Sequence, residues 1–252
     1  MPETRYFIEN FTSALRMLGK TPGGGILKLR HGAGAFATGM PFAGENYALF
    51  DDCSSEEETA RVLGFFEHRK LPFISMQIPE LKKEVSEVLE KRGLSIRAEY
   101  NAMSMRISFS GREQDQYVKR ATDKSGAAKW AEAAWTGFGG ELPVPESYNS
   151  FSAYLSSCPE NRLYYLEKEG IPLCSALLHL ADSTCGLYYF ATRPEARRQG
   201  LAARLMDSLT DHASHFSENM VLLATEMGAK MYKNYGFKGL MRVPVLSGSD
   251  DI

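Results

Sequence analysis

The spacing of apolar residues along the chain predicts amphipathic helices separated by short strands. Phe7, Phe11, Leu15 and Leu18 recur every three or four residues and share one helix face. Similar spacing, with capping residues, predicts helices over 7–18, 54–69, 79–93, 127–138, 150–157, 200–216 and 228–235. Apolar or alternating runs predict strands over 26–29, 72–78, 96–100, 103–109, 117–121, 163–167, 174–180, 186–192 and 220–224, and a final hairpin over 237–246. This alternation predicts an α/β fold, with an α+β arrangement around a mixed sheet.

Two polar segments rich in turn-forming residues divide the chain near its middle. Residues 111–116 interrupt the apolar pattern, and residues 122–126 follow one short predicted strand. A boundary in the first segment gives two tandem domains, 1–112 and 113–252, each of ordinary domain size. Residues 31–36 are glycine-rich but spell no nucleotide-binding fingerprint, so a plain loop is expected there.

Charge and composition narrow the class of protein. The 252 residues carry a net charge of -2, which excludes a strongly basic nucleic-acid binder and an acidic disordered tail. Apolar runs such as 221–224 are far shorter than the roughly 20 residues of a membrane span. The cysteines lack the spacing typical of zinc ligands. The segment Asp211-His212-x-x-His215 has no third ligand, and a polar outer helix face explains its histidines better than a metal site does. We therefore expect no metal site. We therefore expect a cytoplasmic protein with reduced cysteines, without nucleic-acid or membrane partners. The pattern favours no oligomeric state.

Residues 190–205 have the pattern of a strand, a basic turn and a helix opened by glycine. The main-chain N–H groups of residues 198–202 would point outward from the start of that helix, where the helix dipole is positive. Small residues at 200 and 202 would leave those groups accessible. The segment therefore predicts a pyrophosphate site, made by Arg197, Arg198, Gln199, Gly200, Leu201 and Ala202. An ordinary strand–turn–helix connection with a solvated basic turn is the alternative.

Residues 197–202 resemble the Q/R-x-x-G-x-G/A signature of the GNAT-type N-acetyltransferases, which bind acetyl-CoA. Downstream, the strand at 222–226 is followed by Met231-Tyr232-Lys233-Asn234-Tyr235-Gly236-Phe237, which looks like the Leu-Tyr-x-x-x-Gly-Phe segment of the family. The resemblance covers about residues 115–252 and implies the GNAT fold for that half. The N-terminal half is similar to the degenerate GNAT-like domain that precedes some members. It has no signature turn, so we expect no cofactor site in it.

The resemblance also implies how the co-substrate is held. In the family, the strand before the turn separates from the following strand, and the pantetheine arm pairs with the exposed main chain, here at Phe190, Ala191 and Thr192. The family places Tyr232 near the sulfur of coenzyme A, where its phenol would protonate the departing thiolate. A packing role for Tyr232, beside Tyr235 and Phe237, is the alternative.

The residue that removes a proton from the attacking amine is less evident. The family often uses an acidic residue on the central strands, but residues 187–192 contain none. Glu226, at the end of a predicted strand, is the candidate, although a solvated glutamate is common there. His179 is the second candidate, although a histidine among leucines more often faces outward as a surface residue.

The sequence thus favours an N-acetyltransferase that moves the acetyl group of acetyl-CoA to an amine by direct attack. The alternative is a non-catalytic CoA-binding module with a regulatory role, because the missing acid leaves catalysis open. A third reading is an acyltransferase for longer acyl chains. The acceptor stays open between a small-molecule amine and a protein amine. The N-terminal domain is expected to wall part of the acceptor cleft.

Overall fold

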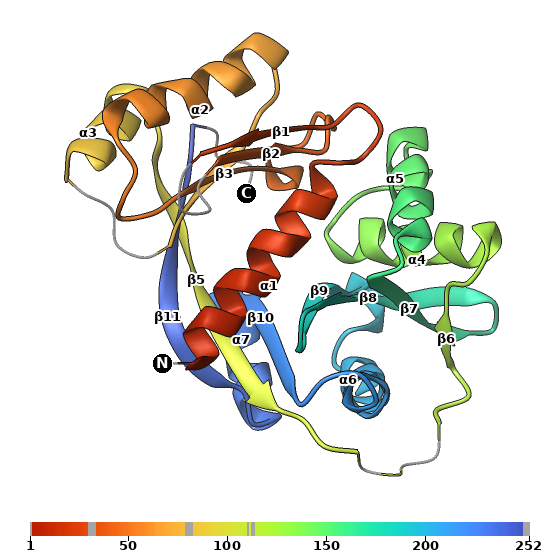
Figure 1. Ribbon diagram of the computed structural model, residues 1–252. Coiled ribbons are helices and arrows are strands. Elements are labelled where there is room, and N and C mark those ends of the chain that lie inside the picture. Colours follow the sequence, from red (N-terminus) through yellow and green to blue (C-terminus); the bar gives the residue numbers. More distant parts are fainter. Residues whose placement is uncertain (1, 30–33, 79–82, 110, 112–113, 249–252) are drawn as a thin grey trace. The chain divides into compact units, whose positions relative to one another are not determined.

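The computed structural model describes residues 2–29, 34–78, 83–109, 111 and 114–248, and these form two compact units (Figure 1). The first unit contains Met1–Met103 and Leu223–Ile252, and the second contains Ser104–Leu222. The predicted boundary after residue 112 lies near the first of these divisions. The sequence analysis does not anticipate the second division, which groups the end of the chain with its beginning.

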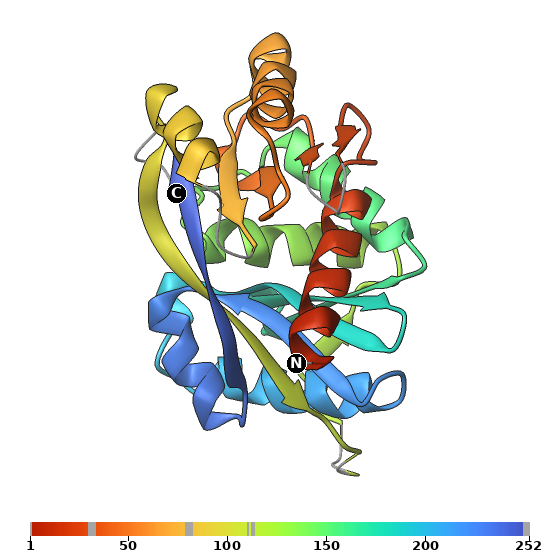
Figure 2. The same ribbon diagram turned by 60° about the vertical axis from the view of Figure 1, so that its left-hand side comes forward.

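The first unit is built on a mixed sheet. Strands β1 (Gly25–Lys28), β2 (Gly34–Ala37) and β3 (Asn46–Phe50) are antiparallel, and β3 is parallel to β4 (Ile74–Gln77). The last strand, β11 (Lys238–Ser247), pairs antiparallel with β4, and β5 (Ser95–Arg106) lies on its other side (Figure 2). The helices of this unit are α1 (Pro2–Leu18), α2 (Glu56–Arg69), α3 (Lys83–Lys91) and α7 (Glu226–Asn234), with a short 3-10 turn, η2 (Ala43–Glu45).

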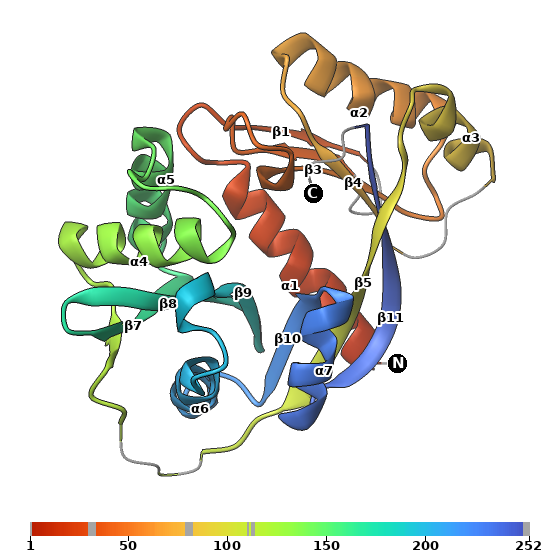
Figure 3. The same cartoon turned by 180° about the vertical axis from the view of Figure 1, so that it is seen from behind.

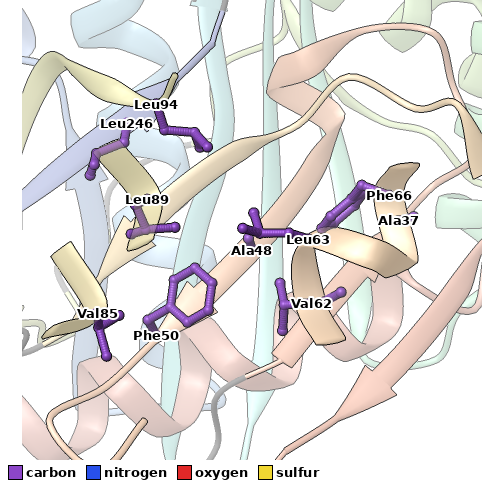
Figure 4. Close-up of a cluster of buried hydrophobic side chains, with 11 residues drawn as sticks. Ala37, Ala48, Phe50, Val62, Leu63, Phe66, Val85, Leu89, Leu94 and Leu246 are labelled. Carbon is purple, nitrogen blue, oxygen red and sulfur yellow. The ribbon is translucent and has the colours of Figure 1, made fainter. Parts of the chain in front are cut away.

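A hydrophobic core joins helices α2 and α3 to this sheet (Figure 4). Val62, Leu63 and Phe66, which lie within the helix predicted over 54–69, are buried in it. Leu246 of β11 belongs to the same cluster, which explains why the end of the chain groups with the N-terminal residues. The start of α2 also agrees with the prediction: Ser55 caps it, and Ser55 and Glu58 form a reciprocal capping box.

The second unit contains the strand order β10-β9-β8-β7-β6. Strands β6 (Val118–Arg120), β7 (Asn161–Lys168), β8 (Ile171–Ala181) and β9 (Thr184–Thr192) are antiparallel to their neighbours, whereas β10 (Asn219–Ala224) is parallel to β9. The helices are α4 (Lys124–Gly137), α5 (Glu146–Ser157) and α6 (Leu201–Ser214), with a 3-10 turn, η3 (Pro194–Ala196). Helices α4 and α6 lie on opposite faces of β7–β9 (Figures 1 and 3).

Four predicted elements are wrong in detail. The two strands expected over 96–100 and 103–109 are one strand, β5, which runs unbroken through Asn101 and Ala102. The expected hairpin over 237–246 is the single strand β11, which continues through its middle residues Met241 and Arg242. Residues 34–36, expected in a loop, belong to β2, which pairs with β1 and β3; residues 31–33 lie outside the described part. Phe216, the last residue of the helix expected over 200–216, follows the end of α6 and is 53% exposed.

No helix in the described part of the chain is long and apolar enough to cross a membrane. The mixed α/β fold itself is as predicted. Pro79, the expected first residue of α3, falls outside the described residues.

Candidate active site

The turn between β9 and α6 adopts an unusual backbone path. After η3, Arg198 has φ of 62° and Gly200 has φ of 75°, so two residues in three are left-handed. A Cβ on Gly200 would meet no atom within 4 Å. The conformation, and not lack of space within the protein, therefore selects glycine at this position. Left-handed residues at a turn also bring successive N–H groups toward one side, which is the geometry of an anion-binding nest.

The main-chain N–H groups of this turn have no acceptor within the part of the chain that the structure describes. Arg204 N bonds to Gly200 O at 3.1 Å and begins the helical ladder. Among the described residues, none accepts a hydrogen bond from the main-chain N–H of 198–202. Leu201 is 2% exposed and anchors the helix start in the core, so these groups are held in place at the positive end of the helix dipole.

The side chains of the predicted site residues differ in their surroundings. The guanidinium of Arg197 donates to Thr192 O and Gly137 O, each at 3.1 Å. Gln199 Nε2 donates to Glu195 O at 3.0 Å. Arg198 is exposed, and within the described residues its side chain has no hydrogen bond or ion pair. Ala202 is half-buried beside the helix start.

Strand β9 carries a bulge at Tyr189, directly before the predicted pantetheine segment. Its register with β8 shifts between Ser175 and Leu177, so that β9 gains an extra residue, and Tyr189 has φ of 49°. The bulge directs the ring of Tyr189 into an aromatic cluster, with ring centroids 5.5 Å from Trp130 and 5.9 Å from Phe151. The bulge is a feature that the sequence analysis missed.

Strand β9 pairs with β8 up to its last residue, whereas its pairing with β10 stops earlier. Ala191 and Thr192 are in register with Ser175 and Cys174 of β8. Toward β10, the register in the described residues runs from Thr184 to Leu187 and stops there. The segment 188–192 therefore extends beyond its pairing with β10, in agreement with the separation expected for the stretch that includes Phe190.

Tyr232 and Glu226 both lie on α7, in the first unit. Tyr232 is 8% exposed, and its ring meets that of Phe237 edge-on with centroids 5.6 Å apart. Burial raises the pKa of Tyr232, so the phenol keeps its proton at neutral pH. Glu226 is exposed and is the first residue of α7 instead of the end of a strand, because Thr225 caps the helix by accepting from Gly228 N at 3.2 Å.

His179 is not the surface residue that the sequence analysis favoured. Its side chain is fully buried in the second unit, and its Nδ1 lies 2.8 Å from Asn161 Oδ1. Because an amide oxygen only accepts, Nδ1 carries the hydrogen. Burial lowers the pKa of His179 to about 4, and the nearby Glu160 opposes this only in part. The buried Asn161 gives the imidazole a polar partner, which the sequence pattern does not reveal.

The histidines of α6 act as packing residues in this structure. The ring of His212 stacks on Tyr164 with centroids 5.2 Å apart, and its Nε2 lies 3.3 Å from Gln114 Nε2. The ring of His215 lies 5.0 Å from that of Phe109.

Three structural residues near the turn were also missed. Arg193 pairs with Glu132 and Glu195, and Gly137 allows α4 to approach β9, since a Cβ there would lie 2.7 Å from Ala191 Cβ. Ser175 donates to the bulge carbonyl. Of these three residues, only Gly137 could be suspected from the sequence, because a glycine in the last turn of a helix can indicate a close approach to a neighbouring element.

Residues 159–239 match a family model described as an acetyltransferase (GNAT) domain, and this range includes every predicted site residue. No curated protein matches the chain.

Solved structures share the fold over most of the chain. A GCN5-related N-acetyltransferase from Kribbella flavida aligns with a TM-score of 0.63 at 14% identity, covering 94% of this chain and 93% of that one. A putative GNAT-family acetyltransferase from Novosphingobium aromaticivorans aligns with a TM-score of 0.54 at 14% identity, covering 85% and 88%. A GCN5-related N-acetyltransferase from Sphaerobacter thermophilus gives 0.52 at 14% identity, covering 74% and 64%. These likenesses establish the fold. Residues 159–239 are therefore similar to the acetyltransferase domain of the GNAT family, whose members are acyltransferases that use acetyl-CoA as co-substrate.

Proposed function

We propose that this protein is an N-acetyltransferase that moves the acetyl group of acetyl-CoA to an amine by direct attack. The observation that carries the proposal is the row of main-chain N–H groups at 198–202 without acceptors among the described residues. A diphosphate presents several anionic oxygens at the spacing of such a row, and the dipole of α6 favours negative charge there. Arg197 and Arg198 add positive charge at the same turn.

The pantetheine arm would lie along β9 beyond its pairing with β10. Phe190, Ala191 and Thr192 follow the bulge, and the register with β10 ends at Leu187. An extended arm with amide groups can pair with such a main chain as an added strand would. Acetyl-CoA held at both its diphosphate and its arm leaves the thioester carbonyl in a defined place, and orientation of this kind supplies a large part of the rate.

Two proton transfers complete the reaction. The amine nitrogen attacks the carbonyl carbon, the carbon–sulfur bond breaks, and the sulfur leaves as a thiolate. We assign Tyr232 as the acid that protonates the thiolate, because its raised pKa keeps the phenol protonated at neutral pH. We assign Glu226 as the group that takes the proton from the amine; it is exposed at the start of α7 and can exchange that proton with water. The fully buried His179 is a weaker candidate for this role.

The reaction needs an amine acceptor, which is a small-molecule amine or a protein amine. We place the protein in the cytoplasm, without nucleic-acid partners, in line with its net charge of -2.

The second candidate function is a CoA-binding module without turnover. The observation in its favour is that β9 carries no acidic side chain along 187–192.

Coenzyme A binding and turnover test the proposal. Gly200→Asp keeps a residue that tolerates the left-handed backbone but places a carboxylate beside the N–H groups, and Gly200→Asn is its uncharged control. We expect calorimetry to show coenzyme A binding to the wild type, a loss of at least about tenfold in Gly200→Asp relative to Gly200→Asn, and thiol release from acetyl-CoA with some member of an amine panel. Binding without turnover on any amine would favour the module. No binding by the wild type, or equal binding by the two variants, would remove the proposed site.

A further inference from the structure

We propose that the adjacent residues Arg197 and Arg198 have different roles: Arg197 is a positioning residue that fastens the turn to α4, and Arg198 is the side chain that contacts the diphosphate. This inference rests on the proposed function. In the signature Arg197 fills the Q/R position and Arg198 an unspecified position, so the signature alone gives Arg198 no role. Their contacts separate them.

Arg197 uses its guanidinium within the protein. Its Nε donates to Thr192 O at 3.1 Å, and its Nη2 donates to Gly137 O at 3.1 Å. Thr192 is the last residue of β9, and Gly137 is the last residue of α4. One planar guanidinium therefore spans the ends of two elements through two of its nitrogen atoms, a fixed fork that the single nitrogen of a lysine does not provide.

The hydrogen bonds from Arg197 satisfy main-chain carbonyl groups at the ends of β9 and α4. The last carbonyls of a helix have no partner in the helix, and a cation at the C-terminus also suits the helix dipole. Gly137 O is one of these carbonyls, and the helix end lies close to β9, since a Cβ on Gly137 would lie 2.7 Å from Ala191 Cβ. Because Gly137 has no side chain, the end of α4 can approach β9, and Arg197 then joins the two elements through its hydrogen bonds.

A second arginine fastens the same two elements. Arg193 has a side chain only 13% exposed, and it pairs with Glu132 of α4 at 3.1 Å and with Glu195 of η3 at 2.8 Å. The turn is therefore tied to α4 at two places, Glu132 and Gly137. With both ties made, the path of the turn is set before any ligand arrives, which reduces the entropy that binding must overcome.

Arg198 has the opposite surroundings. Its residue is exposed, and its side chain has no hydrogen bond or ion pair within the described part of the chain. Its φ of 62° is a strained conformation for a residue with a side chain, and such strain is typical of ligand-binding turns. The guanidinium stands on the same turn as the N–H groups of 198–202, and it can give two parallel hydrogen bonds to a phosphate.

Paired substitutions test the division of roles. Each arginine is changed to methionine, which keeps most of the side-chain length, and to lysine, which keeps the charge. We expect Arg198→Met to raise the Kd for coenzyme A and the KM for acetyl-CoA by about tenfold, with kcat within twofold and an unchanged Tm of the free protein. Arg198→Lys should recover most of this loss, because a point charge still meets the phosphate.

The Arg197 variants should behave differently. We expect both Arg197→Met and Arg197→Lys to lower the Tm of the free protein and to weaken coenzyme A binding, because neither side chain has the two separate nitrogen atoms with which Arg197 meets the two carbonyls. Inorganic diphosphate should compete with coenzyme A for the wild type and for Arg197→Lys, but about tenfold less well for Arg198→Met.

The outcomes separate this inference from the proposed function. If the wild type binds coenzyme A while Arg198→Met binds it equally well, or while Arg197→Lys matches the wild type in Tm and affinity, the division of roles is wrong and the proposed function stands. If the wild type binds no coenzyme A, both are wrong.

Discussion

The side chain of Ser175 and the main chain of Tyr189 are joined across β8 and β9: the Ser175 hydroxyl donates a hydrogen bond of 2.9 Å to the Tyr189 carbonyl oxygen. Tyr189 is the left-handed residue of the β9 bulge, and Ser175 is fully buried. The hydrogen bond therefore stabilises the irregular point of the strand that leads to the proposed pantetheine segment. Small buried groups of this kind support a site without touching its ligand.

Removing this hydroxyl should disturb the bulge. We expect Ser175→Ala to lower the free energy of unfolding by about 1–2 kcal/mol and to raise the KM for acetyl-CoA by about threefold or more. Ser152→Ala is a matched control, because Ser152 is also buried and donates to a carbonyl, that of Asn149 at 2.8 Å, within α5. Urea denaturation and steady-state kinetics measure both effects. A KM that changes equally in the two variants would show that the bulge does not position the co-substrate.

The buried pair of His179 and Asn161 should make the protein sensitive to acid. Burial lowers the pKa of His179 from 6.5 to about 4. Above pH 6.5 the imidazole is neutral in both the folded and the unfolded chain. Between pH 6.5 and 4 the unfolded chain takes up a proton that the folded chain does not, so stability falls as the pH falls. The loss is complete below the folded pKa and amounts to about 3 kcal/mol.

Substitution of His179 tests this linkage. Glutamine does not titrate, and its amide can still donate to Asn161 Oδ1. We expect His179→Gln to lose about 2 kcal/mol less of its free energy of unfolding than the wild type between pH 7 and pH 4.5. The control is His68→Gln, at an exposed residue of α2, which should follow the wild type. Identical pH dependence in His179→Gln and the wild type contradicts the prediction.

Local signals explain which parts of the fold could be predicted. The Ser55 capping box and the core stripe of α2 involve residues three or four apart, so the sequence alone contains them. The turn at Gly200 could be predicted for the same reason: its chemistry consists of consecutive main-chain groups. The signature of the turn needs no information from elsewhere in the chain.

The features that were missed join residues far apart in sequence. The pairing of Val245 with Met76 takes the last strand into the first unit, and neither segment alone indicates it. The hydrogen bond from Arg197 to Gly137 spans 60 residues. The partner that lets His179 be buried is Asn161, on the neighbouring strand. Periodicity reports which face of an element is apolar, but not which distant group will meet it.

The phenol of Tyr232 should act as a proton donor if the proposed mechanism is correct. Tyr232→Phe keeps the edge-on contact with Phe237 and removes only the hydroxyl, so we expect a loss of about 100-fold in kcat with little change in Tm. Tyr235→Phe, at a half-buried residue just past the end of the same helix, is the control. Because burial raises the pKa of Tyr232, the phenol stays protonated as the pH rises, and the wild-type rate should show no loss from this group up to about pH 10. Full activity in Tyr232→Phe assigns the residue to packing instead.

The carboxylate of Glu226 is needed only if the amine arrives protonated. For an alkyl amine acceptor, which is an ammonium ion at neutral pH, we expect Glu226→Gln to lower kcat/KM by about 100-fold. An aromatic amine is already neutral at pH 7, so the same variant should acetylate it at nearly the wild-type rate. Glu56→Gln is the matched control, because Glu56 is likewise an exposed first residue of a helix, α2. Rates with both amine classes, measured for the three proteins, check this. Equal losses for the two amine classes would show that Glu226 acts on something other than the proton of the acceptor.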